Sequence, residues 1–406
     1  MRRGFVLLIV TVILMSVATF FLVRYAQGYR LSLGKNLSKN GIQLTPTGLL
    51  VATSTPDGAS VYIDDHLTSA TDTTIDLPPG EYTVKIVKEE YLPWEKKLKI
   101  QKEVVTQTEA LLFPVAPRLE SLTKTGVLNP AADPGRSMLA FGVASASASM
   151  KNGVYVLDMT ASPILALRNS SVQIANDTSY PLSRGTFEWS PNGRELLVRD
   201  ERTKATYRLR TSEFNNNASD VTATVPVIKA QWEQDAKEIE EAKLETLRPG
   251  LQEFIRDNFK IIAWSADETK ILYEASSSGE KDEKRTIPLF IEPPLIGTNG
   301  QPETREIKPG QYYVYDIKED KNFYLKDIDP NLLHPLWFSD SRHFVFIEER
   351  QIKVMEYDGT NKTVVYSGPF EGNFVYPWPD GSRLVITTSL NPQGGVAANL
   401  YTINLK

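Results

Sequence analysis

Few residues in this chain have the types and the spacing that chemistry requires. The 406 residues include no cysteine, which excludes disulfides, thiolate metal ligands and a cysteine nucleophile. The three histidines, His66, His334 and His343, lie far apart in the sequence. No Gly-x-Ser-x-Gly elbow, His-Glu-x-x-His helix or phosphate-binding glycine loop occurs. We therefore predict no catalytic, cofactor-binding or metal-binding residue, no cofactor and no enzymatic activity.

Carboxylate and amide side chains recur in four turns, at Asn192, Asp267, Asp340 and Asp380. Such a set could ligate calcium, but Asp and Asn in turns usually accept hydrogen bonds from nearby backbone amides, and we expect that role. The run Asp316-x-Lys318-x-Asp320-x-Asn322 lacks the central glycine and the terminal glutamate of a calcium loop. Paired carboxylates for glycan hydrolysis stay open as an alternative, because the sequence singles out no pair.

Tryptophans accompany the same four turns, at Trp189, Trp264, Trp337 and Trp378. They mark a repeat in which residues 189–198 recur at 264–273, 337–346 and 377–386, with a worn first copy at 133–141. Each copy contains a strand, a turn and a second strand, and a third strand follows. We expect the tryptophans to pack between strands rather than to stack on carbohydrate, because all four of the well-preserved copies have one.

Four-stranded repeats with a period near 40 residues are typical of a β-propeller. We predict one over residues 114–406, with five or six blades, because five copies are visible and a sixth could be degenerate. The Trp-Ser-Pro-Asp-Gly repeats resemble the Tol-type propeller family. The chain ends after the third strand of its last repeat, so we predict that a segment within residues 118–127 supplies the missing outer strand and closes the ring.

Two insertions interrupt the predicted ring. Residues 228–258 form the one convincing helical stretch beyond the N-terminus, and Pro249 is expected to begin its second helix. Residues 276–308 form a long loop. Trp232 and Ile239 follow one face of the first helix, and that face must be covered by the propeller itself or by a partner. These two residues are our candidates for partner binding.

Residues 49–113 have a different pattern, with short alternating strands between Pro- and Gly-rich turns. The turn 56–59 (Pro-Asp-Gly-Ala), the strand 61–64 (Val-Tyr-Ile-Asp) and the run 77–82 (Leu-Pro-Pro-Gly-Glu-Tyr) resemble the PEGA domain family. The resemblance implies a small β-sandwich that acts as a spacer or adhesion module without catalytic residues. One departure is Asp65, because the family usually has glycine after its Tyr-Ile-Asp strand.

The N-terminus predicts a membrane anchor. Residues 5–23 carry no charge and, at ~1.5 Å per residue, span ~28 Å as a helix, close to the thickness of a bilayer core. A cleaved signal peptide is the alternative, which the length of the apolar run and Arg24 disfavour. We predict a cytoplasmic tail at 1–4, a signal anchor at 5–24 and a polar stalk at 25–48. The bulk of the chain then lies outside the membrane.

The sequence as a whole predicts an all-β protein with an N-terminal transmembrane helix, a small PEGA-like β-sandwich and a propeller with a helical insertion. We expect it to bind an envelope protein or a cell-wall polysaccharide without catalysis. The alternative is an extracytoplasmic propeller enzyme that acts on glycans as a hydrolase or lyase. The formal net charge of −5 argues against a nucleic-acid partner.

Overall fold

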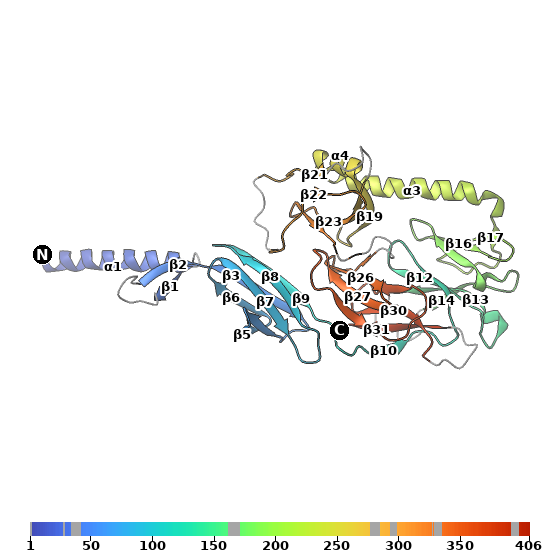
Figure 1. Cartoon of the computed structure of the whole chain (residues 1–406), viewed down its shortest axis with the longest axis horizontal. Coiled ribbons are helices and arrows are strands. Elements are labelled where there is room, and N and C mark those ends of the chain that lie inside the picture. Colours follow the sequence, from blue (N-terminus) through green and yellow to red (C-terminus); the bar gives the residue numbers. More distant parts are fainter. Residues whose placement is uncertain are drawn as a thin grey trace. The chain divides into compact units, whose positions relative to one another are not determined.

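The structure, a computed structural model, describes residues 2–26, 29–33, 42–160, 171–276, 285–292, 299–326, 328, 335–390 and 398–406 (Figure 1). It is mostly β, with 43% of the residues in strands and 17% in helices, as the sequence predicts. The chain divides into two compact units. Unit 1 comprises Met1–Val115 and Ile296–Pro302, and unit 2 comprises Ala116–Leu295 and Glu303–Lys406.

Unit 1 begins with helix α1 (Arg2–Ala26). Its segment Leu7–Tyr25 has a mean hydropathy of 2.4, is not buried, and is long and apolar enough to cross a membrane. Length and composition of this kind fit a membrane anchor and a signal sequence alike. Strands β1 (Tyr29–Leu33) and β2 (Ile42–Pro46) follow as an antiparallel hairpin. Part of the segment expected to be a polar stalk is therefore a two-stranded ribbon.

Seven further strands of unit 1 form two sheets, in the orders β6-β3-β9 and β5-β4-β7-β8. The strands are β3 (Gly48–Thr55), β4 (Ser60–Ile63), β5 (His66–Ala70), β6 (Thr73–Leu77), β7 (Gly80–Val87), β8 (Trp94–Ile100) and β9 (Val105–Leu111). Strand β3 pairs in parallel with β9. Side chains from both sheets, such as Leu50, Val61 and Trp94, share one apolar core.

The sequence patterns reveal five of these seven strands and miss β5 and β6. Both have mostly exposed or half-buried side chains, so they lack the apolar alternation that marks the others. The turn that leads into β5 has positive φ at Asp64 (48°) and Asp65 (63°). These values belong to the type I′ turn, which glycine favours. The hairpin therefore forms with Asp65 at the position where the PEGA resemblance leads us to expect glycine.

Residues 299–302 of the second insertion also belong to unit 1. Asn299 forms an isolated antiparallel bridge with Leu98 of β8. At Gly300 an added Cβ would lie 2.5 Å from the carbonyl oxygen of Lys97, so only glycine permits this close approach. Two other parts of the predicted loop, residues 277–284 and 293–298, lie outside the described residues, as does His334.

Five four-stranded antiparallel sheets make up most of unit 2, and we number them I to V in chain order. Sheet I contains β11 (Leu128–Ala132), β12 (Met138–Val143), β13 (Gly153–Asp158) and β14 (Ser171–Asn176). Sheet II contains β15 (Thr186–Trp189), β16 (Glu195–Arg199), β17 (Thr206–Arg210) and β18 (Ser219–Asp220). Sheet III contains β19 (Phe259–Trp264), β20 (Lys270–Ala275), β23 (Tyr312–Asp316) and β24 (Lys321–Tyr324).

Sheet IV contains β25 (Leu336–Trp337), β26 (His343–Glu348), β27 (Gln351–Glu356) and β28 (Thr363–Tyr366). Sheet V contains β29 (Val375–Pro377), β30 (Arg383–Thr388), β31 (Asn399–Asn404) and β10 (Leu119–Ser121). The small hairpin β21 (Arg285–Thr286) and β22 (Glu306–Ile307) lies in the second insertion. Single 3-10 turns occur at Ser149–Lys151, Leu182–Arg184 and Thr222–Thr224. Each sequence copy of the repeat thus corresponds to one sheet.

The outer strand of sheet V comes from the start of unit 2, as predicted. Strand β10 pairs antiparallel with β31, placing Leu119 opposite Ile403. The Asn399 side chain strengthens this junction, because its Oδ1 accepts hydrogen bonds from Thr123 Oγ1 (3.1 Å) and the Gly126 amide (3.0 Å). The first and last segments of unit 2 are therefore held together by strand pairing and by side-chain hydrogen bonds.

Neighbouring sheets share apolar cores. One described core joins sheets I and II, another joins I and V, and a third joins III and IV. The repeat tryptophans take part as expected: Trp189, Trp337 and Trp378 are buried. Trp264 is only partly buried. None of the described cores joins sheet II to sheet III, although these sheets follow each other in the chain.

The turn acids hold the turns between first and second strands. Asp340 Oδ1 accepts hydrogen bonds from the backbone amides of Arg342 (2.8 Å) and His343 (3.1 Å), and its Oδ2 lies 2.6 Å from His343 Nδ1. Burial alone raises the pKa of Asp340. The interactions with His343 and the backbone amides outweigh burial and lower this pKa to about 2, from an ordinary value of 3.8.

This lowered pKa predicts how acid affects unit 2. The ionised form of Asp340 stabilises the fold, so its contribution is complete above pH ~4 and is lost as the pH falls through about 2. We expect Asp340→Asn to flatten the loss of stability between pH 4 and pH 2 in thermal unfolding of the full chain. Asp57→Asn, in an exposed turn of unit 1, is the control. Equal pH slopes for the unaltered chain and Asp340→Asn would contradict the prediction.

Candidate functional site

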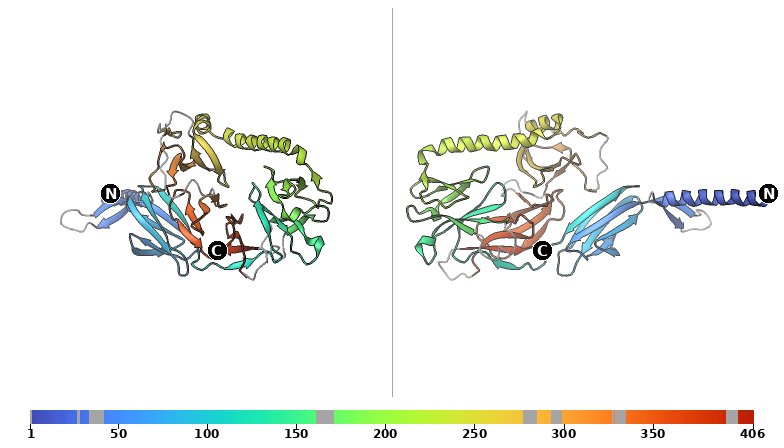
Figure 2. Two further views of the ribbon diagram at one scale, coloured as in Figure 1. Left: turned by 45° about the vertical axis from the view of Figure 1, so that its right-hand side comes forward. Right: turned by 180° about the vertical axis from the view of Figure 1, so that it is seen from behind.

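Two helices occupy the insertion between sheets II and III, where the sequence predicts them. Helix α3 (Val225–Glu245) and helix α4 (Pro249–Asn258) are separated by a short turn, and Pro249 is the first residue of α4. In all three ribbon views α3 runs from the strands of sheet II to α4 beside sheet III (Figures 1 and 2). Helix α3 therefore spans the distance between two sheets that share no described core.

Sheet III has an apolar face that the helices cover. Leu244 of α3 and Leu251 and Ile255 of α4 are buried in one core with side chains of sheet III, among them Tyr273 and Tyr315. In a ring of repeats this face would pack on the preceding sheet. Because burial of this much apolar surface is strongly favourable, the helical insertion takes the place of sheet II as its cover.

Sheet II does not need a cover on its corresponding face, because that face is polar. One face carries Phe187, Trp189, Leu196, Val198, Tyr207 and Leu209, which pack toward sheet I. Strand pairing places Glu195 opposite Arg210 and Leu197 opposite Arg208 on the other face. Arg208 and Arg210 are exposed, with 45% and 70% of their side-chain surface accessible. A face of this kind needs no neighbouring sheet.

The two ends of α3 are attached to the two sheets. Near its start, Lys229 Nζ lies 2.6 Å from Glu188 Oε2 on the polar face of sheet II. Near its end, Lys243 Nζ lies 2.8 Å from Glu268 Oε1 in a turn of sheet III. Exposed pairs of this kind contribute less than about 1 kcal/mol each. Apolar burial therefore contributes more to the attachment than these pairs do: Trp232 is 9% exposed, and Leu244, 4% exposed, lies in the core of sheet III.

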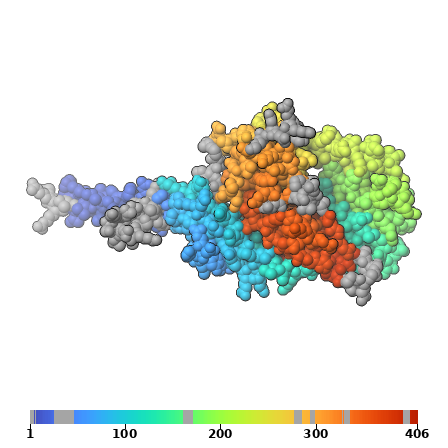
Figure 3. All heavy atoms as spheres, viewed as in Figure 1, coloured from blue at the N-terminus to red at the C-terminus, as the bar shows by residue number. Residues whose placement is uncertain are grey.

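The middle of α3 has no such cover. Ala236 is exposed and Ile239 is 45% exposed, although both follow the helix face on which Trp232 is buried. Figure 3 shows an opening in the surface beside α3, between the part coloured orange and the part coloured green. We call this region the seam and define it by α3, the polar face of sheet II (Glu188, Glu195, Arg208 and Arg210) and Trp264. Of the two candidate partner residues, Ile239 is exposed and Trp232 is buried.

An unpaired indole shows that the seam lacks a neighbour found at the other junctions. Trp189 Nε1 donates to the carbonyl oxygen of Ala131 in sheet I (2.9 Å), and Trp337 Nε1 donates to that of Ala263 in sheet III (3.4 Å). Each of these two tryptophans thus bonds to the preceding sheet. The equivalent Trp264 Nε1 is buried and has no acceptor among the described residues. A buried donor without a partner carries a free-energy cost.

The charges of the seam differ between its two sides, because α3 is acidic and the polar face of sheet II carries both glutamate and arginine side chains. Helix α3 carries six acidic residues and three lysines, whereas the polar face of sheet II presents Arg208 and Arg210. Arg208 lies 3.9 Å from Glu195, and Arg256 of α4 pairs with Glu241 of α3. Partial burial raises the pKa of Glu240, and the adjacent Glu241 carboxylate raises it further. A partner in the seam would therefore meet an acidic helix and a sheet face that carries both signs of charge.

The other residues singled out from the sequence lie apart from the seam. His66 Nδ1 lies 2.7 Å from the carbonyl oxygen of Asp64 in unit 1, and His343 pairs with Asp340. Asp320 accepts hydrogen bonds from the backbone amides of Phe290 (2.7 Å) and Ile291 (3.0 Å). Within the described ranges, no three His, Asp or Glu side chains are grouped as a metal site would require.

The comparisons with known proteins concern unit 1 and the fold of the whole chain. The PEGA domain family matches residues 47–114, which confirms the resemblance seen in the sequence. No curated protein sequence matches the chain. Among solved structures, TolB from Agrobacterium tumefaciens is 12% identical, with a TM-score of 0.24, over 72% of this chain and 79% of that one. TolB from Acinetobacter baumannii is also 12% identical, with the same score, over 80% and 60%. Similarity at this level of sequence identity and TM-score gives no basis for assigning the activity of those proteins to this chain.

The polar face of sheet II is a feature that the sequence interpretation missed. A signal for it exists in the third strands of the repeats. Strand β17 reads Thr-Tyr-Arg-Leu-Arg and alternates, whereas β23 reads Tyr-Tyr-Val-Tyr-Asp and is buried throughout. Alternation indicates a strand with one solvated face, and a continuous apolar run indicates a strand covered on both faces. Comparing the copies position by position would have located the seam.

Because the buried Trp264 indole has no acceptor in the described part of the chain, we predict that two matched substitutions differ in their effect on stability. Trp189→Phe removes a hydrogen bond, whereas Trp264→Phe removes a donor that has no partner among the described residues. We expect Trp189→Phe to lower the free energy of unfolding by about 1 kcal/mol or more beyond the effect of Trp264→Phe. Urea unfolding of the full chain, followed by circular dichroism, measures both. Equal losses would show that Trp264 has an acceptor and that the seam is closed.

Proposed function

We propose that this chain is a membrane-anchored cell-envelope protein that binds a partner protein at the seam, without catalysis. The main observation behind the proposal is that the middle of α3 is not covered. The nearby face of sheet II is polar, whereas the corresponding faces of the other sheets are apolar. A sheet that keeps one solvated face inside a repeat array leaves room for another molecule. Cell-wall polysaccharide is the second ligand class that the same surface could take.

The location rests on unit 1. Helix α1 has the length and composition of a membrane span, and the PEGA match at residues 47–114 follows it in the chain. With α1 retained as a signal anchor, the strands of unit 1 and the whole of unit 2 lie outside the membrane. The first 27 residues hold three arginines and no acid, so the remainder carries a net charge of −8. Anionic lipid repels that charge, so the helix alone would provide the membrane attachment.

The architecture behind the proposal is a five-bladed β-propeller that is open at one junction. Sheets I to V would be the blades, and the Trp-Ser-Pro-Asp-Gly-like copies would mark their first turns. The pairing of β10 with β31 supports this interpretation, because it supplies the outer strand of the last blade from the start of the unit. In this view α3 and α4 stand where a sixth blade would complete the ring.

Binding is proposed rather than catalysis because the seam offers recognition chemistry. Exposed carboxylates and guanidinium groups on opposite sides can form charge-assisted hydrogen bonds with a polypeptide. The acidic surface of α3 also disfavours the anionic polymers of a cell wall. A protein partner with a basic segment toward α3 and an acidic segment toward Arg208 and Arg210 would match both sides.

Site-specific crosslinking in the native membrane tests the seam. A photoreactive amino acid at Ile239 or Arg208 of the full chain is expected to capture one partner of defined mass. The same group at Val364, which is 36% exposed on sheet IV, is the matched control. Identical products from all three positions, or products from Val364 alone, would contradict binding at the seam. Capture of glycan instead of protein would shift the partner to the polysaccharide class.

Protease treatment of intact cells tests the location. The protein should be digested from outside, because unit 2 and the strands of unit 1 are expected beyond the membrane, and a cytoplasmic protein measured in the same sample should survive. Protection of the full chain would place the two units inside. N-terminal sequencing of the mature protein then decides between a retained anchor and a cleaved signal, since a chain beginning after residue 24 would have lost α1.

A further inference from the structure

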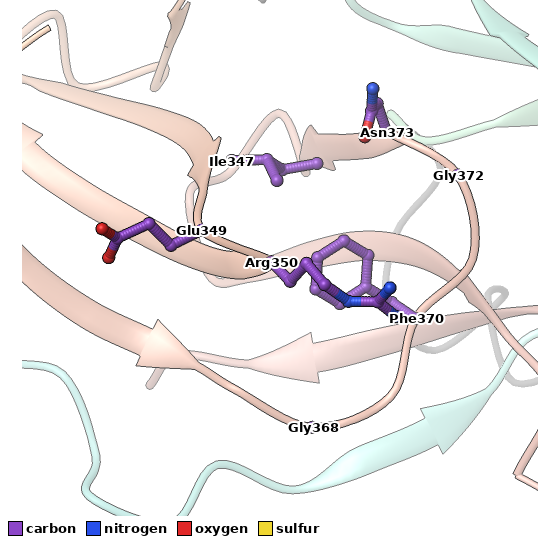
Figure 4. Close-up of a pocket in the computed structure, with 7 residues that line it drawn as sticks. All are labelled: Ile347, Glu349, Arg350, Gly368, Phe370, Gly372 and Asn373. Atoms are coloured by element: carbon purple, nitrogen blue, oxygen red, sulfur yellow. The ribbon is translucent and has the colours of Figure 1, made fainter. Parts of the chain in front are cut away.

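A cavity of about 450 Å³ lies in unit 2, away from the residues of the seam (Figure 4). It is lined by Ile347, Glu349, Arg350, Gly368, Phe370, Gly372 and Asn373. Ile347 lies in β26, and Glu349 and Arg350 form the turn between β26 and β27 in sheet IV. The other residues come from the connection that leads from β28 to β29 in sheet V. A volume of this size accommodates a small molecule or a few residues of a peptide.

The connection between the two sheets gives the cavity an apolar wall with exposed backbone. Phe370 and Ile347 are half-buried and line the cavity. Gly372 has φ +67° and faces open space, and the backbone amides of Gly372 and Asn373 have no acceptor within the described ranges. Thr387 fixes the connection, because its Oγ1 donates to the carbonyl oxygen of Glu371 (2.7 Å). The wall is therefore held in place while its amides face solvent.

The opposite wall is an unfavourable turn that carries two charged side chains. Glu348 pairs with Gln351 across the hairpin, so the loop consists of Glu349 and Arg350 alone. Their φ angles are 52° and 59°, the values of a type I′ turn. Asn and Gly are the residues that suit these two positions. The presence of Glu and Arg there indicates that the side chains have a role beyond making the turn.

The two charged side chains differ in their surroundings. Glu349 lies 3.4 Å from Lys353 Nζ and points away from residues 368–373 (Figure 4). Arg350 extends toward Phe370 in the same view and is exposed, and no described residue forms an ion pair with it. The guanidinium is thus the one charged group of the cavity lining that is left without a counter-ion in the described part of the chain.

We infer that this cavity binds the end of a peptide chain that carries a free α-carboxylate and an apolar last side chain. A planar guanidinium forms paired hydrogen bonds with a carboxylate, and the exposed amides of Gly372 and Asn373 can donate to the same group. Phe370 and Ile347 supply contact area for the apolar side chain. The inference rests on the proposed binding function and deepens it by naming a ligand class for a second surface.

Calorimetric titration of the purified full chain in detergent micelles tests this assignment. The probes are acetyl-Ala-Ala-Leu with a free carboxylate and the same peptide as its C-terminal amide. We expect the acid to bind and the amide to bind at least about tenfold more weakly, the loss typical of a charge-assisted hydrogen bond. Equal affinities for acid and amide, or no binding of the acid, would overturn the inference.

Three variants test whether the tighter binding of the acid depends on the guanidinium of Arg350. Arg350→Gln is expected to weaken binding of the acid at least about tenfold and to remove the difference between acid and amide. Glu349→Gln, at the neighbouring position of the same turn, should leave the affinity within about twofold. The double variant E349N/R350G should lose binding while raising the unfolding midpoint by about 2 °C, because it relieves the turn. Unchanged binding in Arg350→Gln or in E349N/R350G would refute the assignment.

The titration and the crosslinking experiment can fail independently. Peptide binding that depends on Arg350, together with no partner captured from Ile239 or Arg208, would locate recognition at the cavity and remove it from the seam. Capture at the seam with no carboxylate-dependent binding would remove the ligand class inferred here and leave the proposed function standing.

Discussion

The second strand of almost every sheet in unit 2 is apolar on both of its faces, and this constraint governs how the unit packs. Strands β12, β26 and β30 consist of buried residues over most of their length. A strand of this kind is stable only when both faces of its sheet are covered. The shared cores between sheets I and II, I and V, and III and IV meet that requirement. Sheet III receives a helical cover instead, and sheet II avoids the requirement through Arg208 and Arg210.

The sequence predicts the elements of unit 2 well and its packing poorly. The repeated turns, the third strands, the two insertion helices and the strand at residues 119–121 follow from local patterns. Which faces meet is a non-local property, and Trp232 illustrates the limit. Helical spacing places it with Ile239 on one face, yet Trp232 is buried and Ile239 is accessible, because the helix leaves its support between them. The cavity near Arg350 was not predicted, since backbone φ and the course of residues 368–373 decide it.

The seam and the cavity share a physical character. Both keep a local arrangement that is less stable than a simpler alternative: a buried indole donor without an acceptor at Trp264, and charged residues where Asn and Gly would suit the turn at 349–350. Natural chains retain such features where function requires them.

The pairing of β10 with β31 has a consequence for how the chain reaches its folded state. Glu120 and Asn404, which exchange a hydrogen bond across this junction, are 284 positions apart in the sequence. Sheet V therefore stays incomplete until the last residues have been synthesised and, for an exported chain, carried across the membrane. Contacts this distant in sequence form slowly. Until β31 pairs with it, β10 is an unpaired strand whose edge is open to other chains and to quality-control proteases.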